Sequence, residues 1–258
     1  MQPDLAGETF PQAKAAIEEL RRLAHGTSQA PPPRQAVAAA IGVAAAGNDR
    51  ELAIALELAW VGFLRLPSDL SSMGGSTLIP PVAAGGLPKW SLLLYPQEQV
   101  RRSKTLGHDE GVVLHSSALN SADMFLRDLK NNAGPQGAVW SFDTRAFNCK
   151  FRSLMSTIGI SPGVIAYQIR HGAASHAAAS GAMRLDEISE RLRHGSLSST
   201  LRYAKHVRYA TEVERLPSRV RAYGDWVDEH LGPILRGTLV PPGSDTFATT
   251  PANRTLRR

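Results

Sequence analysis

Two short segments of this chain hold residue types that can bind a phosphate ester and attack it. Residues 166–175 read AYQIRHGAAS, and residues 191–206 read RLRHGSLSSTLRYAKH. Guanidinium forks bind phosphate oxygens in pairs, histidine can donate a hydrogen bond to the same group, and a tyrosine hydroxyl can act as a nucleophile. Taken singly, each residue has an ordinary explanation, such as a half-buried ring or a helix-terminal cation. The interpretation therefore depends on whole strings of residues.

The charge distribution favours a polyanionic partner. The chain has 258 residues and a formal net charge of +6. Residues 145–221 hold 13 Arg or Lys and five acidic residues, whereas the rest of the chain holds 16 basic and 18 acidic residues. The positive excess therefore belongs to the stretch that contains both segments. A nucleic acid backbone would complement it, and a solvated basic helix surface is the simpler alternative.

The composition argues against several other classes. The longest apolar runs, residues 36–46 and 52–64, are too short to span a bilayer, so we expect no membrane association. The N-terminus lacks the pattern of a secretory signal, and Cys149 is the only cysteine, which fits a reducing intracellular compartment. There is no Cys/His ligand cluster, Walker-type loop or HExxH motif. We therefore expect neither a cofactor nor a metal.

The elements that must position the two segments are mostly helices. Glycine and proline clusters between residues 71 and 117 separate three short apolar runs, which predicts a small antiparallel sheet. Helical periodicity and cap residues predict the remaining elements. The expected helices are 33–46, 49–64 capped by Asn48 or Asp49, 119–131, 143–158, one starting at Ser161 and Pro162, 185–193, and a region after Tyr203 that breaks near Pro217 and ends near Leu235; the expected strands are Thr77–Ile79, Trp90–Tyr95 and Gly111–Leu114.

The sequence therefore predicts an α+β protein that is predominantly α-helical. Residues 1–32 are interpreted as a short helix, residues 11–24, followed by a proline-rich linker. Residues 33–236 form the main domain. Residues 237–258 have no apolar period and are expected to be a flexible tail.

The segment RLRHGSLSSTLRYAKH resembles the C-terminal signature of the tyrosine recombinase, or phage integrase, family. In that signature a His or Trp precedes the nucleophilic Tyr by nine residues, and His194 and Tyr203 have this spacing. AYQIRHGAAS resembles the family's His-x-x-Arg box, with Arg170 as the second phosphate-binding arginine and His171 after it. The box has Tyr167 where the family usually has histidine.

Two further motifs resemble the same family in the correct order. AWVGFLRLPSDL, residues 59–70, is similar to its Gly-x-Arg-x-x-Glu region, with Arg65 as the first arginine and the acid one residue later than usual. VRRSKTLGHDEGVVL, residues 100–114, is similar to its lysine-bearing β-hairpin. Lys104 is the preferred lysine there, and Lys89 is the alternative. The resemblance covers roughly residues 33–225.

This resemblance implies the tyrosine recombinase catalytic-domain fold and metal-independent breakage and rejoining of DNA through a 3′-phosphotyrosine. It implies that Arg65 and Arg170 bind the phosphate, that His194 donates a hydrogen bond to it, and that Lys104 protonates the departing 5′ oxygen. Tyr167 occupies the position of the family's acid–base histidine. The implied partner is double-stranded DNA.

Family members self-associate into a tetramer on DNA and exchange C-terminal segments, here residues 205–236. The resemblance also implies an intracellular location with the DNA, in the nucleus of a eukaryote or the cytoplasm of a bacterium.

Two alternatives stay open. A type IB topoisomerase resembles this family in fold and chemistry but relaxes supercoils without a partner site. A catalytically inactive, domesticated DNA-binding module is favoured by Tyr167 and by the missing N-terminal helical domain that typically closes around DNA. The chain is then a truncated product, a fragment of a longer protein, or a catalytic domain that works alone.

Overall fold

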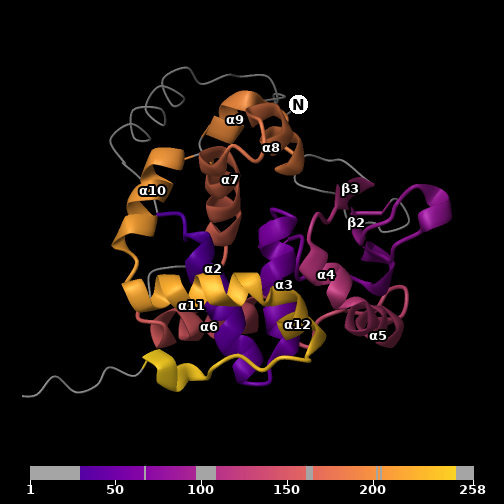
Figure 1. Cartoon of the computed structure of the whole chain (residues 1–258). Coiled ribbons are helices and arrows are strands. Elements are labelled where there is room, and N and C mark those ends of the chain that lie inside the picture. Colours follow the sequence, from indigo (N-terminus) through magenta and orange to yellow (C-terminus); the bar gives the residue numbers. More distant parts are fainter. Residues whose placement is uncertain are drawn as a thin grey trace, which may run out of the picture.

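The computed structural model describes residues 30–66, 68–96, 109–160, 165–201, 203 and 205–247. Helices dominate and a small antiparallel sheet lies to one side, which confirms the α+β prediction (Figure 1). The helices are α2 Arg34–Ala46, α3 Arg50–Val61, α4 Ser117–Ser121, α5 Asp123–Ala133, α6 Thr144–Thr157, α7 Gln168–Ser180, α8 Leu185–Arg191, α9 Leu197–Leu201, α10 His206–Arg215, α11 Ser218–Glu229 and α12 Leu231–Arg236; three 3₁₀ turns lie at Gly75–Thr77, Ala83–Gly85 and Ser244–Phe247; the strands are β1 Leu78–Ile79, β2 Ser91–Leu94 and β3 Glu110–Val113.

Helix α2 forms the centre of the core. Its sequence, RQAVAAAIGVAAA, is apolar on almost every side, and nearly all of the helix is buried, as expected for a helix surrounded by others. Helix α11 crosses it so closely that a Cβ atom added to Gly224 would lie 2.2 Å from the carbonyl oxygen of Gln35. Figure 1 shows α11 lying across α2. Small residues therefore set the distance between these helices.

A polar network fastens the start of α2 inside this core. Arg34 pairs with Glu57 of α3 at 2.8 Å and with Asp228 of α11 at 2.5 Å. The backbone N–H of Arg34 donates to the hydroxyl of Tyr209 on α10 at 2.9 Å. Because these groups are mostly buried, losing one partner would leave another uncompensated. The network thus ties helices from both ends of the described chain together.

Helix α3 begins where its cap residue predicts. The Asp49 side chain accepts a hydrogen bond from Leu52 N at 3.2 Å, which satisfies one of the open N–H groups of the first turn. The helix ends at Val61, and Phe63 then adopts a left-handed backbone with φ of 48°. This turn directs the chain toward Arg65.

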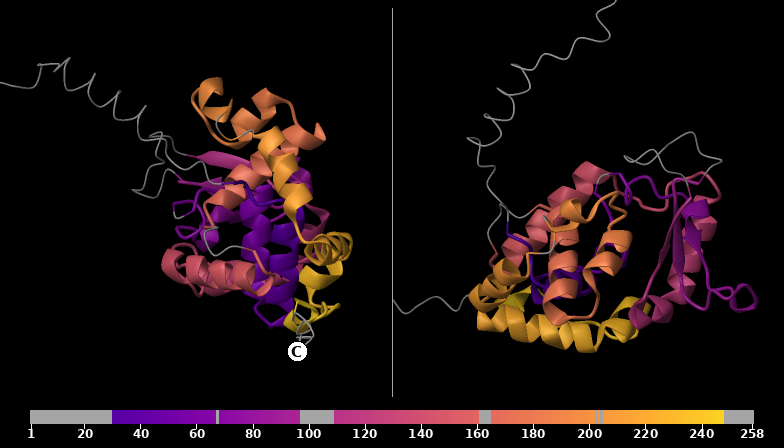
Figure 2. Two further views of the ribbon diagram at one scale, coloured as in Figure 1. Left: turned by 90° about the vertical axis from the view of Figure 1, so that its left-hand side faces the viewer. Right: turned by 90° about the horizontal axis from the view of Figure 1, so that it is seen from above.

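The three strands pair in the order β1-β2-β3, all antiparallel. Leu92 lies opposite Leu78 on one side and opposite Val112 on the other. Trp90, just before β2, is fully buried, and its indole N–H donates to Asp123 at 3.1 Å. Viewed from above, the sheet stands apart from the α7–α10 side of the molecule (Figure 2).

The structure departs from the sequence prediction at two places. Helix α7 begins at Gln168, after a turn at residues 165–167, so Tyr167 precedes the helix that was expected to carry it. The turn is closed because the Gln168 side chain accepts a hydrogen bond from Ile165 N at 2.7 Å. Ser161 and Pro162, the expected start, lie outside the described residues. The predicted helix at 119–131 is divided at Ala122 into α4 and α5.

The expected flexible tail is structured in its first part. After Gly237, residues 238–247 return along α11, and the Tyr223 hydroxyl donates to Pro242 O at 2.8 Å. Phe247 is 4% exposed and meets the Tyr223 ring edge-on at 5.0 Å. Phe247 anchors this segment, and one buried aromatic residue produces no apolar periodicity from which the sequence could predict the packing. Residues 248–258 and the predicted helix at residues 11–24 lie outside the described residues. No described helix is long and apolar enough to cross a membrane.

Candidate active site

Tyr203, which follows α9, lies among the side chains that the sequence strings point to. Its hydroxyl is 2.7 Å from that of Tyr167. Its ring stacks on His171, with centroids 4.0 Å apart and planes within 4° of parallel. On another side the His194 ring lies 4.8 Å away at 57°. The segments 166–175 and 191–206 therefore meet around one phenol.

The backbone of Tyr203 is fastened to α7 by one buried hydroxyl. Ser175 Oγ donates to Tyr203 O at 2.7 Å and accepts from Lys205 N at 3.1 Å. Ser175 is fully buried, so both bonds are protected from water. The tyrosine is thus fixed to the helix that also carries Arg170.

Arg170 is 1% exposed and is held mainly by backbone carbonyls. Its Nη1 donates to Phe63 O and its Nη2 to Leu192 O, while Nη2 also lies 3.4 Å from His194 Nε2. Its guanidinium carbon lies 5.5 Å from the centre of the Tyr203 ring. One N–H of this buried cation, at Nε, lacks a hydrogen-bond acceptor among the described residues.

Burial lowers the pKa of Arg170 to about 10, with further lowering from the positive charges of Arg193 and Arg65. The guanidinium still carries its charge at pH 7. Because the site disfavours this concentrated positive charge, an anion that enters it gains more than it would at an exposed arginine.

His194 is oriented by a chain of hydroxyl groups. Its Nδ1 lies 3.0 Å from Thr200 Oγ1, and Thr200 in turn donates to Ser189 Oγ at 2.9 Å. Thr200 has one hydrogen, which it gives to Ser189, so Nδ1 of His194 is the donor in the first contact. Nε2 therefore faces Arg170 and the centre of the site.

Arg65 lies at the border of the same cluster. Its Nη2 donates to Arg193 O at 3.2 Å, and its backbone N–H donates to Asp69 at 2.7 Å. Nη1 lies 3.9 Å from a carboxylate oxygen of Glu110 and has no hydrogen-bond acceptor among the described residues. The structure thus brings Arg65 to the residue that immediately precedes His194.

A second layer of charges supports Arg65, and sequence reasoning missed most of it. Asp69 is fully buried, accepts a hydrogen bond from Tyr95 Oη at 2.7 Å and pairs with Arg193. Arg193 also lies 3.0 Å from Glu110. The later position of Asp69 after Arg65 made it a weak sequence signal. No spacing rule marked Arg193 or Glu110.

The two aromatic neighbours of Tyr203 differ in their protonation chemistry. Burial raises the pKa of Tyr167 to about 12, with a further contribution from its hydrogen bond to Tyr203. Tyr167 therefore keeps its proton at neutral pH and can donate it in a hydrogen bond to Tyr203 Oη when that oxygen becomes negative. Burial, aided by Lys205 and Arg170, lowers the pKa of His171 to about 4. A neutral imidazole thus stacks on the Tyr203 ring.

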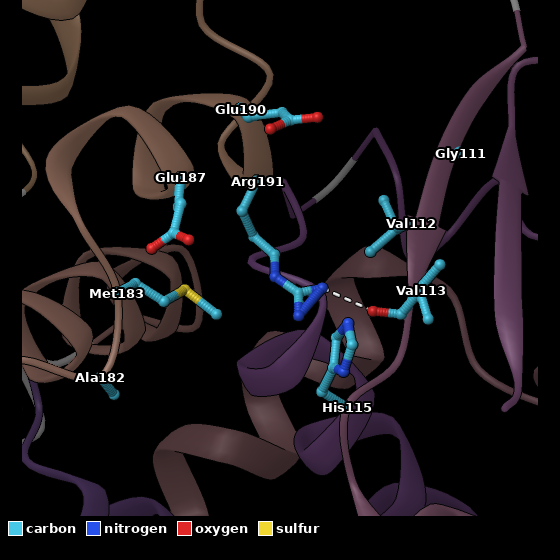
Figure 3. A pocket seen from close by; sticks show the side chains of 9 residues that line it. All are labelled: Gly111, Val112, Val113, His115, Ala182, Met183, Glu187, Glu190 and Arg191. Atoms are coloured by element: carbon cyan, nitrogen blue, oxygen red, sulfur yellow. Dashed lines mark hydrogen bonds between the residues drawn. The ribbon is translucent and has the colours of Figure 1, made fainter.

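The lysine expected to act as general acid is not placed by the structure. Lys104 lies outside the described residues. Lys89, the alternative, has its Nζ 2.9 Å from Nδ1 of His115. His115 lines a cavity of about 530 Å3 between β3 and α8, in which Arg191 reaches across to donate to Val113 O at 2.6 Å (Figure 3).

Among the described residues, no group of three or more His, Cys, Asp or Glu side chains is arranged to hold a metal ion. The site is instead built from arginine, histidine and tyrosine, which bind anions and move protons. Comparison with protein-family models, with curated proteins and with solved structures finds no match to this chain.

Proposed function

We propose that this protein is a tyrosine recombinase catalytic domain that breaks and rejoins DNA strands through a 3′-phosphotyrosine on Tyr203. The observation that carries the proposal is the setting of the Tyr203 phenol. Its ring lies beside the buried cation of Arg170 and the oriented ring of His194, and its hydroxyl contacts Tyr167. A structural tyrosine needs no such group of cations, whereas a nucleophile that attacks a phosphodiester does.

The proposed reaction is a reversible phosphoryl transfer. Tyr203 Oη gives up its proton to solvent water and bonds to phosphorus, and the bond from phosphorus to the 5′ oxygen breaks. The 5′ oxygen takes a proton from a general acid, for which Lys104 is our proposal and Lys89 the alternative. Attack by the 5′ hydroxyl of a strand reverses these steps, because the phosphotyrosine ester conserves the energy of the cleaved bond.

Each clamp residue has a separate task in this proposal. Arg170 Nε and Arg65 Nη1 lack hydrogen-bond acceptors among the described residues, and they would donate to the non-bridging oxygens of the phosphate. His194, when protonated at Nε2, donates to the same phosphate. Tyr167 donates to the developing oxyanion of Tyr203. The basic excess of residues 145–221 supports double-stranded DNA as the partner and a location with it, and a tetramer on DNA belongs to the same proposal.

A trapping experiment tests this function without knowledge of the target site. A pool of duplexes of randomised sequence, each nicked so that the cleaved strand loses a short fragment, is incubated with the protein. We expect a covalent protein–DNA adduct on a denaturing gel. Tyr203→Phe should form none while binding DNA within a few fold of wild type. Tyr223→Phe, which removes another partly buried phenol oxygen at a distance from the site, is the matched control and should still form adduct.

The outcomes separate the alternatives. Adduct formation by Tyr203→Phe would refute the assignment of the nucleophile. DNA binding by the wild type without any adduct would favour an inactive DNA-binding module. Adduct formation together with relaxation of supercoiled plasmid, but with no recombinant product, would favour topoisomerase chemistry.

A further inference from the structure

Arg193 occupies a backbone position that normally belongs to glycine. Helix α8 ends in two hydrogen bonds, from Arg193 N to Glu190 O at 2.8 Å and from His194 N to Ser189 O at 3.1 Å. This pair of bonds defines a helix end that reverses through a left-handed residue, and Arg193 has φ of 54°. A side chain at this position strains the backbone, and glycine avoids that strain. The arginine side chain must therefore contribute something that glycine cannot.

The side chain of Arg193 contributes a buried charge between two carboxylates. It is 8% exposed, pairs with Asp69 through Nη2, and lies 3.0 Å from Glu110 through Nε. Its own carbonyl accepts from Arg65 Nη2 at 3.2 Å. One residue thus touches both acids and the first arginine, and its neighbour in sequence is His194.

Without Arg193, the two acids would face Arg65 directly. Asp69 already accepts the backbone N–H of Arg65, and Glu110 Oε2 already lies 3.9 Å from Arg65 Nη1. When a buried carboxylate loses one of its cations, its attraction to another cation beside it is no longer shared, and Arg65 lies beside both acids. Arg65 would then be bound by protein carboxylates, and its open N–H would no longer be available to an incoming anion.

We infer that Arg193 is a positioning residue that neutralises Asp69 and Glu110, keeping Arg65 available for a phosphate group. This inference rests on the proposed function, because it assigns a regulator to the same phosphate clamp. Among the described residues the cluster has three guanidinium groups, Arg65, Arg170 and Arg193, and two carboxylates. Removing Arg193 equalises the charges and abolishes the excess that an anion would neutralise.

The test uses Arg193→Gly in the full chain, since glycine relieves the backbone and removes the side chain together with its charge. We expect its single-turnover rate of adduct formation to fall at least tenfold. Adding Glu110→Gln should restore the rate to within threefold of wild type, because Glu110 is the acid beside the Nη1 group of Arg65, whereas Asp69 accepts the backbone N–H of Arg65. The matched control adds Glu190→Gln, which removes an exposed carboxylate on α8 that forms no ion pair with Arg193 among the described residues, and should give no recovery.

A purely structural role would not be reversed by removing a second charge. The inference would be overturned if Arg193→Gly formed adduct at the wild-type rate. It would also be overturned if adding Glu110→Gln did not restore the rate. If the glycine variant does not fold, Arg193→Gln keeps the length of the side chain and should show the same loss and the same recovery.

The affinity for inorganic phosphate, measured by calorimetry, separates this inference from the proposed function. Wild type should bind phosphate at least tenfold more tightly than Arg193→Gly, with recovery on adding Glu110→Gln. If wild type forms no adduct but this affinity pattern holds, the proposed reaction fails and the role of Arg193 stands. If adduct forms and the affinity pattern is absent, the role of Arg193 fails alone.

Discussion

Replacing Tyr167 by phenylalanine removes one oxygen from the site and leaves its ring packed edge-on against His171 at 5.5 Å. The lost contact is the 2.7 Å hydrogen bond to Tyr203 Oη, which in the proposed reaction becomes a bond to a charged oxygen as Tyr203 gives up its proton. Hydrogen bonds to charged groups contribute about 1.5–3 kcal/mol. At about 1.36 kcal/mol per factor of ten, adduct formation should slow roughly 10- to 150-fold. Stability should change by only about 1 kcal/mol, because the ground-state bond joins two neutral hydroxyls.

The measurement is single-turnover adduct formation on the nicked duplex pool, with urea unfolding of the same preparations to report stability. Tyr223→Phe, which also loses a tyrosine hydroxyl bond, should cleave at the wild-type rate. A rate for Tyr167→Phe within threefold of wild type would show that this hydroxyl does not assist the nucleophile. A loss as complete as that of Tyr203→Phe would instead make Tyr167 a rival nucleophile.

Four further predictions address other parts of the molecule. Arg170→Ala should slow adduct formation by two to three orders of magnitude, since one desolvated clamp supplies roughly 3 kcal/mol in a transition state, and near-normal cleavage would remove it from the site. Lys104→Ala should be severely slow on normal DNA but substantially rescued when sulfur replaces the 5′ bridging oxygen, whereas selective rescue of Lys89→Ala would assign the general acid to Lys89. Burial lowers the pKa of His171 from its ordinary value of 6.5 to about 4 in the folded chain. Between these two pH values the unfolded chain binds a proton at His171 that the folded chain does not bind. The free energy of unfolding should therefore drop by about 1 kcal/mol more between pH 7 and pH 5 in wild type than in His171→Gln, after discounting for partial exposure, and equal slopes would contradict this. Gly224→Ala should lower the free energy of unfolding by about 1–3 kcal/mol, because its Cβ would meet Gln35 O at 2.2 Å, and an unchanged urea midpoint would show that α11 can move aside.

The sequence predicted those features that depend on local chemistry. Asp49 was a predictable cap for α3, because a short carboxylate just before a helical apolar run can accept an N–H of the first turn. The three short apolar runs became strands because glycine and proline confine them on both sides. The segments 166–175 and 191–206 predicted Arg170 and Tyr203 as site residues, and the fold places these two side chains together.

Features that depend on tertiary contacts could not be predicted in this way. Arg193 ends a helix in a left-handed turn, for which glycine is the usual sign, and its partners Asp69 and Glu110 are far away in the sequence. Helix α7 starts at Gln168, later than the start predicted from Ser161 and Pro162, because the Gln168 side chain accepts a hydrogen bond from Ile165 N and closes a turn before the helix. The segment after Gly237 is held by one ring, Phe247, which no periodicity reveals.

The hydroxyl of Ser175 joins Tyr203 and Lys205 to the helix that carries Arg170, so the proposed nucleophile and the proposed phosphate clamp are connected within one copy of the chain. In the proposed reaction, this connection determines how the rate of strand cleavage depends on protein concentration. One bound copy would hold a complete set of cleaving groups, and nicking should rise hyperbolically with protein concentration. Any sigmoidal dependence would belong to the later joining of strands from different duplexes, so the two steps should be separable by dilution.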